Sequence, residues 1–173
     1  MRIPTLTTER LILRPFRSED LDAHAAMNAD PRVMQYIGDV QDRPAAFRSM
    51  CSYIGHWQFR EYGPWAVEER ATGTFIGRTG VMRSEPPWSD VEVAYALVAS
   101  AWGKGYAREM AARSLRYAQE VVRARGVVSY IMLGSTASIR VAERLGALYA
   151  RDAGVQVKGN PVSVYVYPDP AGG

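Results

Sequence analysis

The chain has 173 residues, of which 47% are hydrophobic and 23% are charged, and its formal net charge is +3. These values predict one globular domain over residues 1–173, with a loose tail at 168–173. No apolar stretch is long enough to span a bilayer and no apolar signal core follows Met1, so we expect a cytoplasmic protein that does not bind membranes. A single cysteine, Cys51, and two histidines exclude an internal disulfide bond and predict no metal site.

The first half of the chain alternates between strand-like and helical patterns. Alternating apolar residues indicate strands, whereas a capping residue such as Ser18, or a proline, before a run with helical spacing indicates the start of a helix. These patterns predict, in chain order, a strand at 10–16, helices at 19–27, 31–36 and 44–59, and strands at 65–69 and 75–83. The last two strands flank a Thr72–Gly73 turn and so form a hairpin.

The second half contains a strand, a long helix and further alternation. The predicted elements are a strand at 91–98, a helix at 107–122 with Gly126 as its C-cap, a strand at 127–133, a helix at 138–145, and strands near 148–151 and 162–167. This order predicts an α/β (α+β) fold, a mixed twisted sheet of about six to seven strands with helices on both faces. The strand–helix–strand unit at 91–133 should be a right-handed parallel crossover.

The segment 102–107, Trp-Gly-Lys-Gly-Tyr-Ala, lies between the strand at 91–98 and the long helix. A glycine loop in this position collects free backbone N–H groups at a helix N-terminus, and these groups bind phosphates together with the helix dipole. A Walker loop is excluded because Lys104 is not followed by Ser or Thr, and a dinucleotide fingerprint is excluded because Arg108 stands where a third Gly or Ala is needed. An ordinary turn before a helix is the alternative.

Basic residues concentrate in this same region. Residues 100–126 carry six basic and two acidic side chains, which leaves the rest of the chain slightly acidic. A basic helix after an anion-binding loop suits a small polyanionic ligand, although the late arginines fit a solvated helix face equally well. No pattern typical of nucleic-acid binding is present, so we expect no such partner.

The loop resembles the acyl-CoA pyrophosphate loop of the GNAT superfamily of N-acetyltransferases, which is usually Gln/Arg-x-x-Gly-x-Gly/Ala. Gly105 and Ala107 match this pattern, while Trp102 stands where Gln or Arg is usual. Three further segments resemble the RimJ/RimL-like branch of that superfamily, namely 8–14 (Thr-Glu-Arg-Leu-Ile-Leu-Arg), 30–33 (Asp-Pro-Arg-Val) and 138–146 (Ser-Ile-Arg-Val-Ala-Glu-Arg-Leu-Gly). The chain departs from the family at Ser135, where Asn is frequent, and at Ala142, where many members have a Tyr that acts as the general acid.

The resemblance implies acetyl-CoA as co-substrate and an amine as acceptor. It implies that the pantetheine arm lies along the end of the strand at 91–98 and that the pyrophosphate lies on the loop. The implied CoA contacts are Ala96, Leu97, Val98, Trp102, Gly103, Lys104, Gly105, Tyr106, Ala107, Arg108, Ser135 and Arg140.

Acetyl transfer to an amine needs a proton acceptor, an oxyanion site and a proton for the leaving thiolate. Glu92 is the predicted base because a carboxylate in an apolar strand has a raised pKa, and it shares a strand face with Ala94 and Ala96. A structural carboxylate paired with an arginine, or delivery of the proton through water, are the alternatives. Ser138 is predicted to hydrogen-bond the CoA sulfur and to assist departure of the thiolate, with a helix N-cap as its alternative, and Tyr130 and Tyr149 are reserve acids.

The acceptor pocket is expected to contain Tyr36, Tyr95 and Trp88, although aromatic residues at these spacings also suit the core. The predicted function is an acetyl-CoA-dependent N-acetyltransferase in which a primary amine attacks the thioester directly. A protein N-terminus, a small-molecule amine and an amino acid all stay open as acceptors, and the protein could act as a homodimer. A non-catalytic acyl-CoA-binding module and a nucleotide-binding protein are the competing functions.

Overall fold

One eight-stranded sheet runs through the part of the chain that the computed structural model describes, residues 2–86 and 90–170. Its strands are β1 (Leu6–Thr7), β2 (Leu11–Arg14), β3 (Pro64–Glu69), β4 (Thr74–Met82), β5 (Glu92–Leu97), β6 (Val128–Met132), β7 (Leu148–Val157) and β8 (Asn160–Val166). Their order in space is β1-β2-β3-β4-β5-β6-β8-β7, and all neighbours are antiparallel except β5 and β6. The predicted mixed sheet is confirmed, with one strand more than expected, because the two-residue β1 is too short to show alternation.

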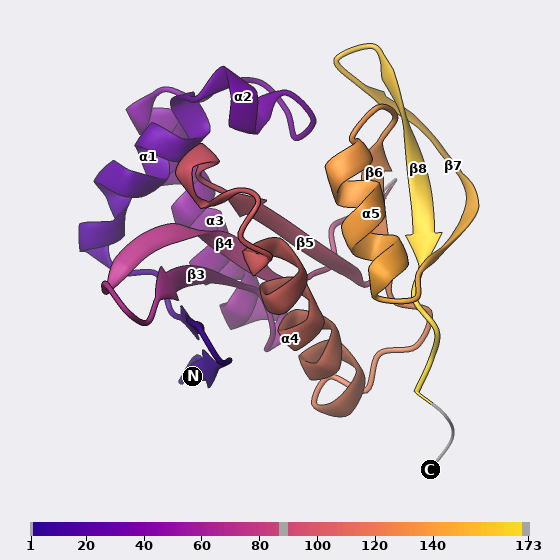
Figure 1. Ribbon diagram of the computed structural model, residues 1–173, viewed down its shortest axis with the longest axis horizontal. Helices are drawn as coiled ribbons and strands as arrows, with labels where there is room; N and C mark the ends of the chain where they lie inside the picture. Colours follow the sequence, from indigo (N-terminus) through magenta and orange to yellow (C-terminus); the bar gives the residue numbers. More distant parts are fainter. Residues whose placement is uncertain (1, 87–89, 171–173) are drawn as a thin grey trace.

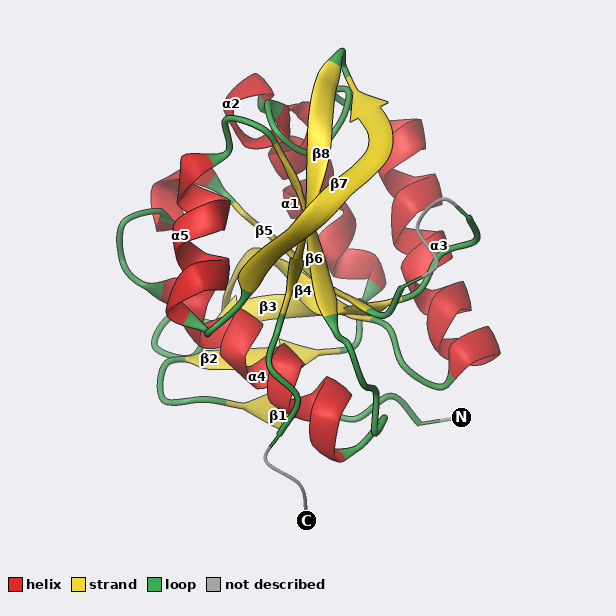
Figure 2. Cartoon of the chain, turned by 90° about the vertical axis from the view of Figure 1, so that its right-hand side faces the viewer, coloured by secondary structure: helices red, strands yellow, loops and turns green. Residues whose placement is uncertain are grey.

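Helices cover both faces of this sheet, as predicted. They are α1 (Leu21–Ala29), α2 (Pro31–Met34), α3 (Arg43–Arg60), α4 (Tyr106–Glu120) and α5 (Thr136–Arg144), with short 3-10 turns η1 (Ser18–Asp20) and η2 (Ala99–Ala101). Figure 2 shows α3 and α5 on opposite sides of the strands. A hydrogen bond of 3.0 Å between the hydroxyls of Thr79 on β4 and Ser114 on α4 marks the face that α4 covers. No helix in the described part of the chain is both long and apolar enough to cross a bilayer.

Several predicted boundaries are wrong for local reasons. Ser18 does not cap α1, because residues 18–20 form the turn η1 and Asp20 precedes the helix. Gly126 does not cap α4, which ends at Glu120, and its N–H instead donates to Asp169 Oδ1 at 3.0 Å. Strand β7 continues to Val157, well past the predicted end, through two irregularities in its register with β8. Residues 171–173 of the predicted tail lie outside the described residues.

The parallel pair β5 and β6 meets at one end only. Glu92 and Val128 are the residues in register, and the pairing does not continue beyond them. In place of a longer ladder, the Ser129 hydroxyl donates to the Val93 carbonyl at 2.6 Å. Figure 1 shows the chain from β6 onward, in orange and yellow, standing beside the indigo-to-red part that ends with α4. The two strands therefore open into a wedge at the centre of the sheet, and this wedge holds the candidate site.

Candidate active site

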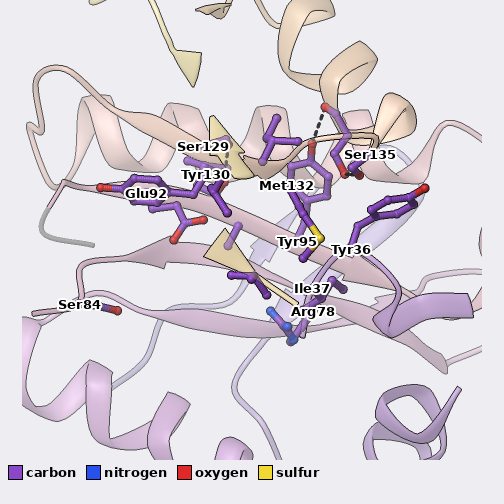
Figure 3. Close-up of a pocket in the computed structure, with 16 residues that line it drawn as sticks. Tyr36, Ile37, Arg78, Ser84, Glu92, Tyr95, Ser129, Tyr130, Met132 and Ser135 are labelled. Atoms are coloured by element: carbon purple, nitrogen blue, oxygen red, sulfur yellow. Dashed lines mark hydrogen bonds between the residues drawn. The ribbon is translucent and has the colours of Figure 1, made fainter. Parts of the chain in front are cut away.

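A cavity of about 280 Å³ lies in the opening between β5 and β6. Figure 3 shows its lining side chains. The strands contribute Arg78, Glu92, Val93, Ala94, Tyr95, Ser129, Tyr130, Ile131, Met132, Val157 and Val162, and the segments around them contribute Tyr36, Ile37, Ser84, Ser135 and Ser138. Four residues predicted for catalysis or the acceptor pocket thus lie around one cavity, Glu92, Ser138, Tyr36 and Tyr95. Trp88, the fifth, lies outside the described residues.

Glu92 carries a carboxylate that is only partly exposed, at the first position of β5. Burial raises the pKa of Glu92 to about 7, against a backbone hydrogen bond from Tyr130 and the positive charge of Arg78, which both act to lower it. None of the ion pairs within residues 2–86 and 90–170 includes Glu92. In the described residues Glu92 is therefore not a structural carboxylate paired with an arginine. A carboxylate with this pKa accepts protons near neutrality.

The cavity has two chemically different sides. Glu92 is opposite Met82 and Ala96 is opposite Arg78 in the β4–β5 ladder, so Glu92 and Arg78 share one face of the sheet. Tyr95 is opposite Thr79, whose hydroxyl contacts α4, and therefore points to the other face. In Figure 3 the Glu92 carboxylate and the Arg78 guanidinium lie on one side, and the Tyr95 hydroxyl points the other way.

Ser138 lies on the Tyr95 side, within the first turn of α5. Its carbonyl accepts a hydrogen bond of 3.1 Å from the Tyr95 hydroxyl, and its own hydroxyl accepts one of 3.0 Å from Ser135. Ser138 is not the N-cap, because Ser135 occupies that position. The Ser138 hydroxyl proton is therefore available to a ligand in the cavity, whereas burial raises the pKa of Tyr95 and makes it a poor proton donor.

The glycine loop ends directly at the N-terminus of α4. Gly103 and Gly105 have φ angles of +75° and +82°, a left-handed conformation that glycine adopts without strain. Gly105 is the N-cap and provides no capping side chain, so the N–H groups of the first turn of α4 are left for an anion. Lys104 and Arg108 are exposed beside them. The loop has the backbone geometry and charge that a pyrophosphate requires.

Two contacts that the sequence did not predict hold this loop in place. Arg10, beside β2, donates to the Lys104 carbonyl at 2.9 Å and forms a salt bridge of 2.7 Å with Glu109 on α4. The Trp102 indole N–H donates to the Leu97 carbonyl at 3.0 Å and ties the loop to the end of β5. Arg10 belongs to the segment 8–14 that resembles the family's first strand, which was the only signal available for it.

Other predicted residues have different surroundings. The Val98 N–H donates to the Ile76 carbonyl at 2.9 Å, so backbone alternation directs the N–H groups of Tyr95 and Leu97 toward the opening. The Tyr130 hydroxyl donates to Asp90 at 2.7 Å, and the exposed Tyr149 lies outside the cavity lining. Arg140 is exposed on α5. Within the described residues, no cluster of three or more acidic, histidine or cysteine side chains could hold a metal ion.

Comparison with known proteins agrees with this geometry. Residues 10–148 match the model of the acetyltransferase (GNAT) domain family. The chain is 30% identical over 166 residues to the protein YkkB of Bacillus subtilis (strain 168), which covers 92% of this chain and 93% of that protein. The fold of the present chain is similar to that of the acetyltransferase of Agrobacterium tumefaciens strain C58. The TM-score is 0.86 at 30% identity, with 98% of this chain and 96% of that chain covered.

A third similar structure is RimL, a ribosomal L7/L12 alpha-N-protein acetyltransferase solved with coenzyme A. The TM-score is 0.80, with 96% of this chain and 98% of that chain covered, and at 16% identity the likeness concerns the fold. The chain belongs to the GNAT acetyltransferase domain family and is an acyltransferase of that family. The family uses acetyl-CoA, and the wedge between β5 and β6 and the uncapped N-terminus of α4 both fit that molecule.

Proposed function

We propose that this protein transfers the acetyl group of acetyl-CoA to a primary amine, as a member of the RimJ/RimL-like branch. The observation that carries the proposal is the placement of a partly buried carboxylate, Glu92, in the cavity at the opening of the sheet, on the strand β5 whose other end leads through the glycine loop to the uncapped N-terminus of α4. The proposal extends to residues 1–173 as one acetyltransferase domain. Acetyl-CoA supplies the acetyl group as a thioester, with its pyrophosphate on the loop from Trp102 to Arg108.

Glu92 acts as the general base. The amine nitrogen forms a bond to the acetyl carbon, the carbon–sulfur bond breaks, and the amine proton passes to the Glu92 carboxylate directly or through one water. The backbone N–H groups of Tyr95 and Leu97 face the opening and suit the developing oxyanion. Ser138 donates a hydrogen bond to the departing thiolate from the opposite side of the sheet, and the thiolate takes its proton from solvent. Ser135 orients the Ser138 hydroxyl at 3.0 Å.

The competing function is an acyl-CoA-binding module without turnover. Ser135 and Ala142 favour it, because they replace residues that many family members use. The pKa of Glu92 favours an enzyme, because a binding module gains nothing from a carboxylate buried without an ionic partner.

A single assay separates these functions. Purified protein is incubated with acetyl-CoA and a panel of amines that includes peptides, small amines and amino acids, and free thiol and acetylated product are both measured. We expect thiol and acetylated amine to form in equal amounts with at least one acceptor class. Tight acetyl-CoA binding without either product would favour the binding module, and stronger thermal stabilisation by ATP than by CoA would favour a nucleotide-binding protein.

A further inference from the structure

Arg78 is a basic side chain that lines the cavity on the side of Glu92, where the proposed mechanism places the amine acceptor. It lies on β4 opposite Ala96, on the same sheet face as Glu92, and it lines the cavity with that carboxylate. Its guanidinium carbon is 5.3 Å from the centre of the Tyr53 ring on α3, so the aromatic face supports the guanidinium from below. The position of the charge is therefore fixed by the sheet and by α3.

The guanidinium has no ionic partner. Within residues 2–86 and 90–170, no ion pair and no side-chain hydrogen bond includes the Arg78 guanidinium, and its Nε is buried without any acceptor. Arg78 is half-buried, whereas the buried Arg14 is bound by both oxygens of Asp20 and by Glu68. A buried donor without an acceptor lowers the stability of the fold, and a bound ligand with an acceptor group would remove this cost. The Arg78 guanidinium is therefore a candidate ligand-binding group in the cavity.

Within the described residues, no carboxylate on its own side of the sheet forms an ion pair with Arg78. His24 is fully buried close by, and burial together with the Arg78 charge lowers the pKa of His24 to about 4, which keeps that ring neutral. The positive charge of Arg78 acts to lower the pKa of Glu92, but the two side chains do not form an ion pair. The cavity thus offers one separate positive and one separate negative group on the same face.

We propose that the acceptor of this enzyme is a small amine that also carries a carboxylate, with Arg78 binding the carboxylate and Glu92 receiving the amine proton. This assignment rests on the acetyl transfer proposed above and specifies its substrate class. A planar guanidinium binds a carboxylate through two parallel hydrogen bonds, which fixes the direction of the amine. A protein N-terminus has its first carboxyl group in an amide bond and brings no charge to this position.

The test compares each acceptor with its uncharged counterpart. The wild-type protein is assayed with α-, β- and γ-amino acids and with the matching carboxamides, under saturating acetyl-CoA. The same assays are run with Arg78→Gln and Arg78→Lys, and with Arg43→Gln as a control that removes an exposed arginine paired with Asp22. The KM for acetyl-CoA in every variant shows whether the fold and the donor site are intact.

We expect the wild type to favour acids over amides, and Arg78→Gln to raise the KM for the best acid by about 10- to 100-fold. The KM values for the matching amide and for acetyl-CoA should stay within about twofold of the wild-type values. The KM of Arg78→Lys for the acid should lie between those of the wild type and Arg78→Gln, because lysine keeps the charge without the planar guanidinium. Equal use of acids and amides, with equal loss in Arg78→Gln, overturns the carboxylate assignment while acetyl transfer stands. Absence of turnover with every amine overturns both, and acetyl-CoA binding then shows whether the donor site fails as well.

Discussion

In the proposed mechanism Glu92 and Ser138 act from opposite sides of the opening, so that Glu92 takes a proton from the amine on one side and Ser138 stabilises the thiolate on the other. Glu92 shares its face with Arg78, and Ser138 is contacted by Tyr95 from the other face. Because the two groups belong to different elements, β5 and α5, each can be changed without moving the other.

Ser138→Ala tests the hydrogen bond to the thiolate. Removal of the hydroxyl should lower kcat by roughly 10- to 100-fold, because the thiolate then leaves without a donor, while the KM for acetyl-CoA changes little. Steady-state kinetics with a saturating acceptor measures this effect. Ser135→Ala is the matched control, because it removes the partner of Ser138 but keeps the hydroxyl, and it should cost clearly less. An equal loss in both variants would contradict the donor role.

Single residues could be predicted from the sequence where their type contrasts with their neighbours. Glu92 stands out in the sequence because a carboxylate interrupts an apolar strand, and its burial in the cavity raises its pKa as expected, while its role as the base stays a prediction. Arg78 could not be found, because its importance depends on the strand beside it and on Tyr53 in a distant helix. The sequence shows such pairs only after the register is known.

At the scale of elements, α4 and its loop behave as one unit that β2 and β5 support. Arg10 contacts both the Lys104 carbonyl and Glu109, and its guanidinium lies 4.6 Å above the centre of the Tyr106 ring. Trp102 adds the link to Leu97. The anion site is thus held in shape before any ligand binds, which lowers the ordering cost of binding.

Gly105→Asp tests the anion site. The new carboxylate would lie at the N-cap, where it repels phosphate and competes for the free N–H groups of α4. We expect CoA binding to weaken by about 1–3 kcal/mol, measured by calorimetric titration. Gly73→Asp is the matched control, because Gly73 also has a left-handed φ of +68° and lies in the β3–β4 turn with open space around it. Unchanged CoA affinity in folded Gly105→Asp would place the pyrophosphate elsewhere.

Arg10→Ala tests the support of the loop. Loss of the bond to Lys104 and of the salt bridge to Glu109 should raise the KM for acetyl-CoA several-fold, with kcat nearly unchanged, because Arg10 touches no atom of the cavity. The comparison variant is Arg32→Ala, which breaks an exposed salt bridge with Asp30. If both variants behave alike, the contact with the loop has no role in binding.

Elements were predictable where local signals were strong. Helices α2 and α3 begin directly after Asp30 and Asp42, whose side chains accept hydrogen bonds from backbone N–H groups of the first turn. Each of these first turns also contains a proline. The full length of β7 was not predictable, because it is exposed along most of its length and shows no apolar alternation. The end of α4 was missed because the segment after Glu120 keeps apolar residues at helical spacing.

At the scale of the whole molecule, side chains hold the two parts of the sheet together around the opening. Ser129 donates across the opening to the Val93 carbonyl at 2.6 Å. Tyr130 reaches Asp90 at 2.7 Å. These contacts replace the missing backbone ladder, so the wedge is a fixed feature of the fold. In the proposed mechanism the amine acceptor approaches Glu92, and the CoA sulfur approaches Ser138, from opposite faces of one sheet.

The pH dependence of kcat/KM in wild type and Glu92→Gln tests this account most directly. Since the pKa of Glu92 is about 7 and only its ionised form accepts a proton, wild-type activity below that pH should fall by about tenfold per pH unit more than protonation of the amine alone produces. Glu92→Gln should lose roughly 10²–10⁴-fold in turnover at neutral pH, lack this ionisation, and recover partly at high pH as the amine loses its own proton. CoA affinity should not change. A folded variant with near-normal turnover at neutral pH, and with the same dependence below pH 7 as the wild type, would contradict the role of Glu92 as the base.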